Sequence, residues 1–204
     1  MPSASPDWKT FHRAAVGRPP RELLRRTLGF FSIEQRPPGI AIDLGCGSGA
    51  DTLEMLRHGW EVHAVDAEPS GLEMLGQSVP EAMRGRIHTH TEKLESFAFP
   101  KCDFIWAGYS LPFCTRDHWP ALMQRAVAAL RPRGRIAGDL FGNKHAFAGN
   151  SDILVLSESR ARRALADLVV EAFDVEDGYR PSGNEITRWH AFGFAARKPE
   201  EGDP

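Results

Sequence analysis

The chain has 204 residues, of which 42% are hydrophobic and 25% are charged, values typical of a globular domain. Its formal net charge of −2 gives no overall support for nucleic-acid binding, and no apolar run is long enough to span a membrane. Three cysteines without a C-x-x-C spacing indicate neither a disulfide framework nor a zinc site, so we expect a reducing, cytoplasmic location.

We expect a single domain over residues 1–204, because this length suits one hydrophobic core. Residues 1–7 and 198–204 are predicted to be disordered tails. The first of these segments lacks the basic start and apolar centre of a signal peptide. Residues 8–35 are predicted to form an N-terminal helical cap, in which Pro20 suits a helix start.

Strands and helices alternate after this cap. A strand is predicted over residues 39–44, a helix over 50–58 and a second strand over 60–66. Gly59 stands where the residue after a helix end usually adopts a left-handed conformation. Pro69 suits the first turn of the next helix.

The same alternation continues through the middle of the chain. Strands are predicted over residues 87–91 and 102–108, followed by a helix over 119–130 with apolar residues at helical spacing. The Pro-Arg-Gly sequence at 132–134 breaks this helix. A fifth strand is predicted over residues 134–140.

The C-terminal part changes character. A helix is predicted near residues 157–170, and two extended runs over 173–179 and 186–196 flank a turn at 181–184. These runs predict an antiparallel hairpin. The fold class is therefore α/β: a doubly wound, mostly parallel seven-stranded sheet with helices on both faces and a C-terminal antiparallel hairpin.

The stretch Asp-Leu-Gly-Cys-Gly-Ser-Gly at 43–49 follows the first predicted strand, and Asp66 follows the second. Glycines let backbone N–H groups approach a ligand closely, because no Cβ stands in the way. An acid after the second strand can accept both hydroxyls of a ribose. Together these features predict a nucleoside-bearing cofactor at the ends of two parallel strands.

The glycine spacing alone does not identify the cofactor. Gly45, Gly47 and Ala50 also fit the G-x-G-x-x-A pattern of NAD-binding proteins. Asp43 stands where those proteins usually carry an apolar residue, and Gly49 adds a third glycine. Both features, with the terminal hairpin, argue against a nicotinamide-dependent oxidoreductase.

Over roughly residues 8–198 the sequence resembles the class I S-adenosylmethionine (SAM)-dependent methyltransferases. The stretch 43–49 resembles their first motif, and Asp66 resembles their ribose-binding acid. Residues 130–135 are similar to the turn that precedes their fifth strand. Residues 189–198 are similar to the last strand of the small-molecule branch, which includes tellurite-resistance-type methyltransferases.

The resemblance implies SAM as the cofactor. Its amino-acid end would meet N–H groups of the glycine turn and the following helix start. Glu92 resembles by position the acid that meets the adenine amino group, with the Lys93 N–H on a ring nitrogen, although a solvated loop acid is the alternative. The residues assigned to cofactor binding are Asp43, Gly45, Cys46, Gly47, Gly49, Asp66, Ala67, Glu92, Lys93 and Ala107.

A methyl acceptor is expected beyond the fourth strand, near residues 107–114. Methyl transfer from an activated sulfonium mainly requires proximity, orientation and a dry pocket. The segment lacks the Asn/Asp-Pro-Pro-aromatic sequence of enzymes that methylate amides or adenine amino groups. Tyr109 and His145 are the catalytic candidates: Tyr109 lines the pocket or packs, and His145 serves as a base or an acceptor contact.

Other side chains have less definite roles. His12, with Trp8 and Phe11, lies in a segment that forms a lid over the cofactor or packs against the sheet edge. His88 and His90 alternate on one strand face, but no third ligand follows at a useful spacing, so we predict no metal site.

The leading functional prediction is a SAM-dependent methyltransferase that acts on a small molecule through oxygen, nitrogen, sulfur or a chalcogen oxyanion. The alternatives are a non-catalytic SAM-binding module and an NAD-dependent oxidoreductase on a related fold. A nucleic-acid methyltransferase is less favoured by the charge. We expect a monomer or homodimer without nucleic-acid or membrane partners.

Overall fold

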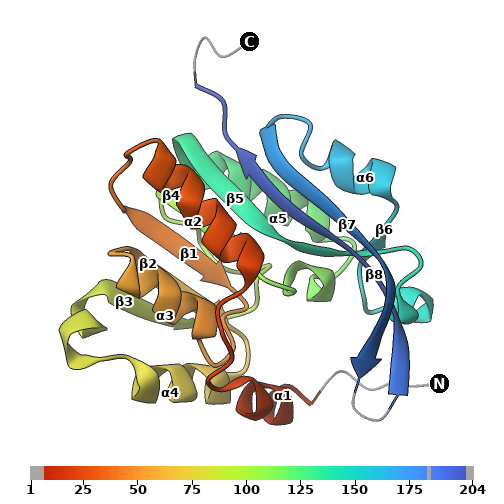
Figure 1. Cartoon of the computed structure of the whole chain (residues 1–204), viewed down its shortest axis with the longest axis horizontal. Helices are drawn as coiled ribbons and strands as arrows, with labels where there is room; N and C mark the ends of the chain where they lie inside the picture. Colours follow the sequence, from red (N-terminus) through yellow and green to blue (C-terminus); the bar gives the residue numbers. More distant parts are fainter. Residues whose placement is uncertain (1–6, 183–184, 201–204) are drawn as a thin grey trace.

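A computed structural model describes residues 7–182 and 185–200 as a three-layer α/β fold around one mixed sheet (Figure 1). The strand order is β3-β2-β1-β4-β5-β8-β7, with β6 paired to β5. Strands β1 to β5 run parallel to one another, and β8 is antiparallel to both β5 and β7. The strands are β1 (Ile40–Leu44), β2 (Glu61–Asp66), β3 (Ile87–Thr91), β4 (Cys102–Ala107), β5 (Leu130–Gly142), β6 (Val155–Leu156), β7 (Val169–Ser182) and β8 (Glu185–Arg197).

The predicted fold class is confirmed. The path from β3 to β7 has the seven strands that the sequence predicts, and the two-residue β6 adds an eighth within the described part of the chain. In Figure 1 the long hairpin of β7 and β8 extends past the end of β5. This hairpin closes the side of the sheet opposite β3.

Helices cover both faces of the sheet. In Figure 1, α2 and α3 lie in front of the sheet and α5 lies behind it. Leu28, Met55 and Leu75 from α2, α3 and α4 share one buried cluster, whereas Leu122 of α5 and Ala161 of α6 belong to another. The helices are α1 (Trp8–Ala15), α2 (Glu22–Ile33), α3 (Ala50–Arg57), α4 (Pro69–Ser78), α5 (Trp119–Ala129) and α6 (Glu158–Arg163), with short 3₁₀ turns η1 (Glu81–Arg86), η2 (Leu111–Phe113) and η3 (Ala146–Gly149).

Three element boundaries differ from those predicted by four residues or more. The helix predicted over 157–170 ends at Arg163, because the next turn tightens to i→i+3 hydrogen bonds such as Leu168 N–H to Leu165 O. Val169 then begins β7, as its β-branched side chain favours. Strand β5 begins at Leu130 rather than 134, since Leu130 pairs with Cys102 before a register shift.

The prediction that residues 7 and 198 belong to disordered tails was wrong, because both residues make defined hydrogen bonds. Asp7 caps α1, where its Oδ1 accepts the Thr10 N–H at 3.1 Å. Lys198 is held against β5: its N–H donates to Gly134 O at 2.8 Å and its ammonium donates to Leu130 O at 2.8 Å. Residues 1–6 and 201–204 of the predicted tails lie outside the described residues, as do Gly183 and Asn184 of the predicted turn.

The described residues include no helix with the length and apolar character needed to cross a bilayer.

Candidate functional site

The glycine turn between β1 and α3 adopts a backbone that requires glycine. Gly45, Gly47 and Gly49 have φ values of 72°, 53° and 84°, a region that other residues enter at a cost. A Cβ on Gly49 would lie 2.3 Å from the Leu75 side chain, so space also excludes a larger residue. The N–H groups of Gly45 and Cys46 donate to Val65 O at 2.8 and 3.0 Å, which fixes the turn to the end of β2.

Asp66 links the glycine turn to the segment after β2. Its Oδ2 accepts the Gly47 N–H at 2.8 Å, and its Oδ1 accepts the Glu68 N–H at 2.9 Å. The residue is 8% exposed. Because each carboxylate oxygen has a further lone pair, the side chain can still accept hydroxyl groups from a ligand.

Asp43 is buried near the end of β1, before the glycine turn, and contacts the helix that follows the turn. Its Oδ2 accepts the Thr52 hydroxyl at 2.5 Å. Burial, together with repulsion from Asp51, raises the pKa of Asp43 to about 7, although the Thr52 hydrogen bond opposes this shift. Asp43 therefore positions the turn through α3 and is not fully ionised near neutral pH.

The other predicted cofactor residues lie along the same edge of the sheet. Ala107 is buried at the end of β4, whereas Ala67 after β2 is exposed. Glu92 and Lys93 are exposed after β3, and the Glu92 N–H donates to Asp66 O at 3.1 Å. The Cys46 thiol is buried, and burial raises its pKa, so this cysteine contributes backbone rather than thiolate chemistry.

Helix α1 lies over the glycine turn, which brings His12 into the site. His12 is 4% exposed, and its Nε2 lies 3.9 Å from Asp66 Oδ2. A Cβ on Gly47 would lie 3.1 Å from the imidazole, so the glycine makes room for this ring. The Nδ1 atom of His12 is buried without a hydrogen-bond partner among the described residues.

Sequence reasoning missed Asp51, which anchors the chain between α1 and α2. Asp51 is 3% exposed in the first turn of α3. Its carboxylate accepts two hydrogen bonds from the Arg18 guanidinium at 3.1 and 2.6 Å, the Arg21 N–H at 2.9 Å and the Trp106 indole N–H at 3.2 Å. The one available signal was an acid at a helix start, which usually indicates only a dipole interaction.

Tyr109 stands at the expected acceptor side in a strained backbone conformation, with φ of 55°. Its N–H donates to Asp139 Oδ2 at 3.3 Å, and the Arg21 guanidinium lies 4.8 Å from its ring centroid. Burial and the nearby Asp139 carboxylate raise the pKa of the Tyr109 hydroxyl. Tyr109 is therefore a neutral group that shapes the site.

His145 lies in an aromatic cluster next to Tyr109. Its ring stacks on Phe141, with centroids 3.9 Å apart, and lies edge-on to Trp189 at 4.8 Å. Nδ1 accepts the Phe147 N–H at 3.2 Å, so the proton of the neutral ring is on Nε2. Burial lowers the pKa of His145 to about 4, with His190 adding to the effect. His145 therefore offers an N–H donor and not the base that the sequence left open.

Asp139 is a second acid that sequence reasoning missed, and it makes stability depend on pH. Burial raises its pKa to about 7, against the opposing effects of Arg21 and the Tyr109 N–H. Folded Asp139 thus keeps a proton that the unfolded chain loses near pH 4. This contribution to stability is complete below about pH 4 and is lost as pH rises through about 7.

We expect Asp139→Asn to stabilise the protein relative to wild type at pH 8 but not at pH 4. The difference in unfolding free energy should shift by up to about 4 kcal/mol between these two values. Urea unfolding at several pH values in this range measures this difference in unfolding free energy. The titration of Asp43 contributes equally to both proteins, because both contain it, and so does not affect the difference. A difference that does not vary with pH would show that Asp139 does not take up a proton on folding.

We compared the site with two pockets in the structure. One of about 290 Å³ opens beside the glycine turn, where Ser48 and Arg18 are among its lining residues. A cleft of about 620 Å³ lies between α5 and α6 and contains none of the predicted site residues. The cleft therefore does not mark the predicted site.

Comparison with known proteins shows which families resemble this chain. A family profile described as a methyltransferase domain matches residues 41–134, a range that includes the glycine turn, Asp66 and Tyr109. Magnesium-protoporphyrin O-methyltransferase from Rhodobacter capsulatus is 33% identical over 70 residues, which are 34% of this chain and 31% of that protein. The glycine turn, Asp66 and Tyr109 thus lie in a segment that is similar to a methyltransferase domain.

Solved structures of methyltransferases share the fold of this chain. TehB from Haemophilus influenzae aligns with a TM-score of 0.71 and 16% identity, over 85% of this chain and 62% of that one. A 1,6-didemethyltoxoflavin-N1-methyltransferase from Burkholderia thailandensis, with bound 1,6-didemethyltoxoflavin and S-adenosylhomocysteine, aligns with a TM-score of 0.63 and 21% identity, over 98% and 93% of the two chains. The chain spans less than a third of the length of the curated relatives that it matches.

The residues of the glycine turn fit SAM. SAM has no phosphate, and the turn carries no lysine of the kind that binds phosphates. The buried Nδ1 of His12 lacks a partner beside Gly47 and Asp66, so the site has an unused polar group. The family profile that matches this turn describes a methyltransferase domain, which favours SAM over the NAD-dependent alternative.

Proposed function

We propose that this chain is an enzyme that transfers a methyl group from SAM to a small planar acceptor bearing an oxygen or nitrogen lone pair. Bound SAM supplies an electrophilic methyl group on a sulfonium. In the transfer, the acceptor lone pair forms the new bond to carbon while the sulfur keeps the electrons of the broken bond. The products are the methylated acceptor, S-adenosylhomocysteine and, where the acceptor atom carried a hydrogen, a proton released to water.

We infer the class of acceptor from a cluster of aromatic side chains near the ends of β4 and β5. Tyr109, Phe113, Phe141 and Trp189 surround one another there, with the Tyr109 and Trp189 ring centroids 5.4 Å apart. Nε2 of His145 and Nε1 of Trp189 are both buried without partners among the described residues. Two unpaired N–H donors between aromatic rings favour a flat molecule that carries a hydrogen-bond acceptor.

An assay for S-adenosylhomocysteine across an acceptor panel tests this proposal. We expect turnover with planar phenols or nitrogen heterocycles, and little with aliphatic amines, thiols or tellurite. Trp189→Phe keeps an aromatic ring at this position but removes the indole N–H donor. This variant should raise KM more than it lowers kcat. S-adenosylhomocysteine binding without turnover of any acceptor would instead favour the non-catalytic module.

The placement of α1 favours the lid alternative for the N-terminal segment. Trp8 packs against Phe113 with ring centroids 4.6 Å apart, and His12 covers Gly47, so α1 bridges the two halves of the site. Phe11, by contrast, is 54% exposed. Opening of α1 would uncover both the glycine turn and the acceptor side.

We expect S-adenosylhomocysteine to slow chymotryptic cleavage at Phe11, by up to about 100-fold at a ligand concentration 100 times Kd, if cleavage requires the open state. Tyr179 on β7 is 70% exposed and supplies a control cleavage site in the same digest, whose rate should not change. Equal slowing at both sites, or none at Phe11, would contradict a lid.

The remaining parts of the proposal concern location and partners. Cys46, Cys102 and Cys114 are free and buried, which supports a reducing compartment such as the cytoplasm. A monomer or homodimer without nucleic-acid partners stays our prediction, and size-exclusion chromatography with light scattering distinguishes the two oligomeric states.

A further inference from the structure

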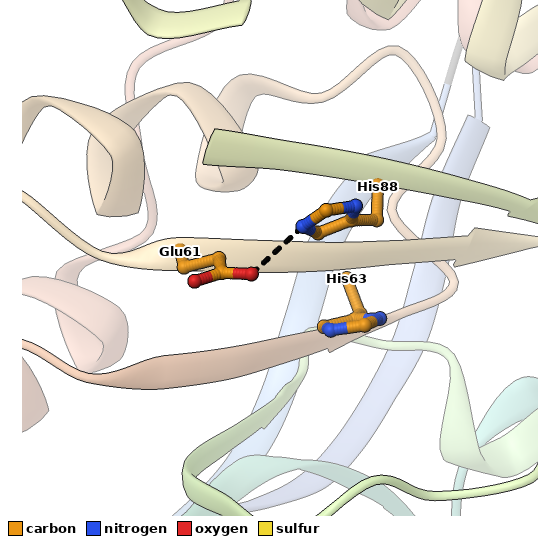
Figure 2. A group of neighbouring side chains, drawn as sticks. All are labelled: Glu61, His63 and His88. Atoms are coloured by element: carbon orange, nitrogen blue, oxygen red, sulfur yellow. Dashed lines mark hydrogen bonds and ion pairs between the residues drawn. The ribbon is translucent and has the colours of Figure 1, made fainter. Parts of the chain in front are cut away.

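Four ligand-type side chains gather on one face of the β2–β3 edge of the sheet. Glu61 and His63 alternate along β2, and His88 and His90 alternate along β3. The parallel register pairs His63 with His88, so the four side chains share a face. Figure 2 shows Glu61, His63 and His88 close together on the two strands.

This face is opposite the α3–α4 layer. Val62 and Ala64, the neighbours of His63, are buried in the cluster that α3 and α4 contribute to, so His63 points to the other face. Residues 92–101 connect β3 to β4 without a helix, which leaves this corner of the sheet without helical cover. The side chains of His88 and Glu61 are consequently 44% and 47% exposed.

The distances suit a shared ligand. One potential ligand atom from each of Glu61, His63 and His88 lies within 4.8 Å of those of the other two, and His88 Nε2 is 2.8 Å from Glu61 Oε1. Bonds of about 2.0–2.2 Å to a tetrahedral metal place ligand atoms roughly 3.4 Å apart. Small rotations of the exposed Glu61 and His88 side chains cover the difference.

His90 is placed to orient His63. Nδ1 of His63 and Nε2 of His90 are 3.0 Å apart, a hydrogen-bond distance between two imidazoles. When His63 donates from Nδ1, its Nε2 carries the free lone pair. A metal-binding histidine usually has such a partner on its other ring nitrogen.

We propose that Glu61, His63 and His88 bind a divalent transition-metal ion, with Zn²⁺ as the best match, and that His90 is a positioning residue. Two imidazoles and one carboxylate are a donor set that zinc favours, and they leave a fourth position for water. The ion would join the edge strand β3 to β2. Nothing in this proposal depends on methyl transfer, because Asp66 and the glycine turn face the other layer.

Titration of the tag-free full chain with Co²⁺, followed by competition with Zn²⁺, tests the site. We expect one equivalent of Co²⁺ to give visible d–d absorption that Zn²⁺ abolishes. The double variant His63→Ala/His88→Ala should lose at least about tenfold in affinity, since loss of an outer partner alone typically costs that much. Glu61→Gln should weaken binding and alter the Co²⁺ spectrum.

The matched control is His58→Ala, at the residue that follows α3. The His58 side chain is 48% exposed and lies 3.5 Å from Glu54, and this pair belongs to no such three-residue group among the described residues. This variant should bind metal as wild type does. Zn²⁺ should raise the melting temperature of wild type and of His58→Ala, but not that of the double variant, whose metal-free melting temperature reports folding.

Two results would overturn the proposal. One is the absence of stoichiometric Co²⁺ or Zn²⁺ binding by the wild-type chain. The other is binding by the folded double variant with wild-type affinity, which would place the metal elsewhere.

Discussion

Asp66→Ala should weaken the binding of S-adenosylhomocysteine about 10- to 150-fold. Hydrogen bonds to a charged group contribute roughly 1.5–3 kcal/mol, and each 1.4 kcal/mol is a tenfold change in Kd. In the structure the carboxylate also accepts the Gly47 and Glu68 N–H groups at 2.8 and 2.9 Å. The substitution therefore removes both the predicted ribose contact and the support of the glycine turn. Calorimetric titration measures the change.

Two further variants, one at Asp66 and one at a control position, test this prediction. Asp66→Asn keeps one acceptor oxygen but loses the charge, so we expect its affinity to lie between those of wild type and Asp66→Ala. Asp117→Ala removes an exposed aspartate from the loop before α5 and should leave the affinity unchanged. An Asp66→Ala variant that binds with wild-type affinity would remove Asp66 from the cofactor site.

Local sequence patterns were sufficient for most of the sheet. Strands β1 and β4 are largely buried apolar runs bounded by glycine, proline or polar residues. The predicted limits of all four strands β1 to β4 agree with the observed ones to within one residue. Pro69 begins α4, and Gly59 has the positive φ of 93° expected after a helix. These features depend on neighbours in the sequence, which is why they could be read directly.

Predictions failed where distant contacts decide the structure. Residues 164–168 have helical composition, yet pairing of β7 with β8 over 169–182 ends α6 early. Asp139 could not be recognised as a buried acid, because its environment comes from Arg21 and Tyr109, far away in the sequence. Tertiary context overrides local propensity in both cases.

The histidine group makes the same point. His88 and His90 were visible as a pair with period two, but the further ligands are 25 or more positions earlier, on β2. Only the parallel register that pairs His63 with His88 brings them together. A sequence search for a third ligand at short spacing therefore could not find them.

Asp51→Ala should lower the free energy of unfolding by about 3 kcal/mol. Removing one partner of a buried ion pair costs about 3–5 kcal/mol because the other charge loses its compensation. We expect the lower end, since the Arg18 side chain is 26% exposed and can regain water. Urea unfolding with an unchanged m value would measure the loss.

The exposed pair of Arg26 and Asp174 is the matched control. One Arg26 nitrogen contacts both oxygens of Asp174, but the two side chains are 43% and 54% exposed. Asp174→Ala should therefore cost less than about 1 kcal/mol. If the two variants lost equal stability, burial of the Asp51 network would not be the source of its effect.

Asp51 also couples the stability of the fold to access to the cofactor site. It holds the Arg18 side chain and the Arg21 backbone, and both residues belong to the segment that connects α1 to α2. Its loss should free α1 without changing the glycine turn, so cleavage at Phe11 should accelerate while cleavage at Tyr179 should not. Asp51→Asn, which keeps an acceptor for the Arg21 N–H, should restore part of the protection. Cleavage at Phe11 that stays at the wild-type rate in Asp51→Ala would show that α1 is held by Trp8 and His12 alone.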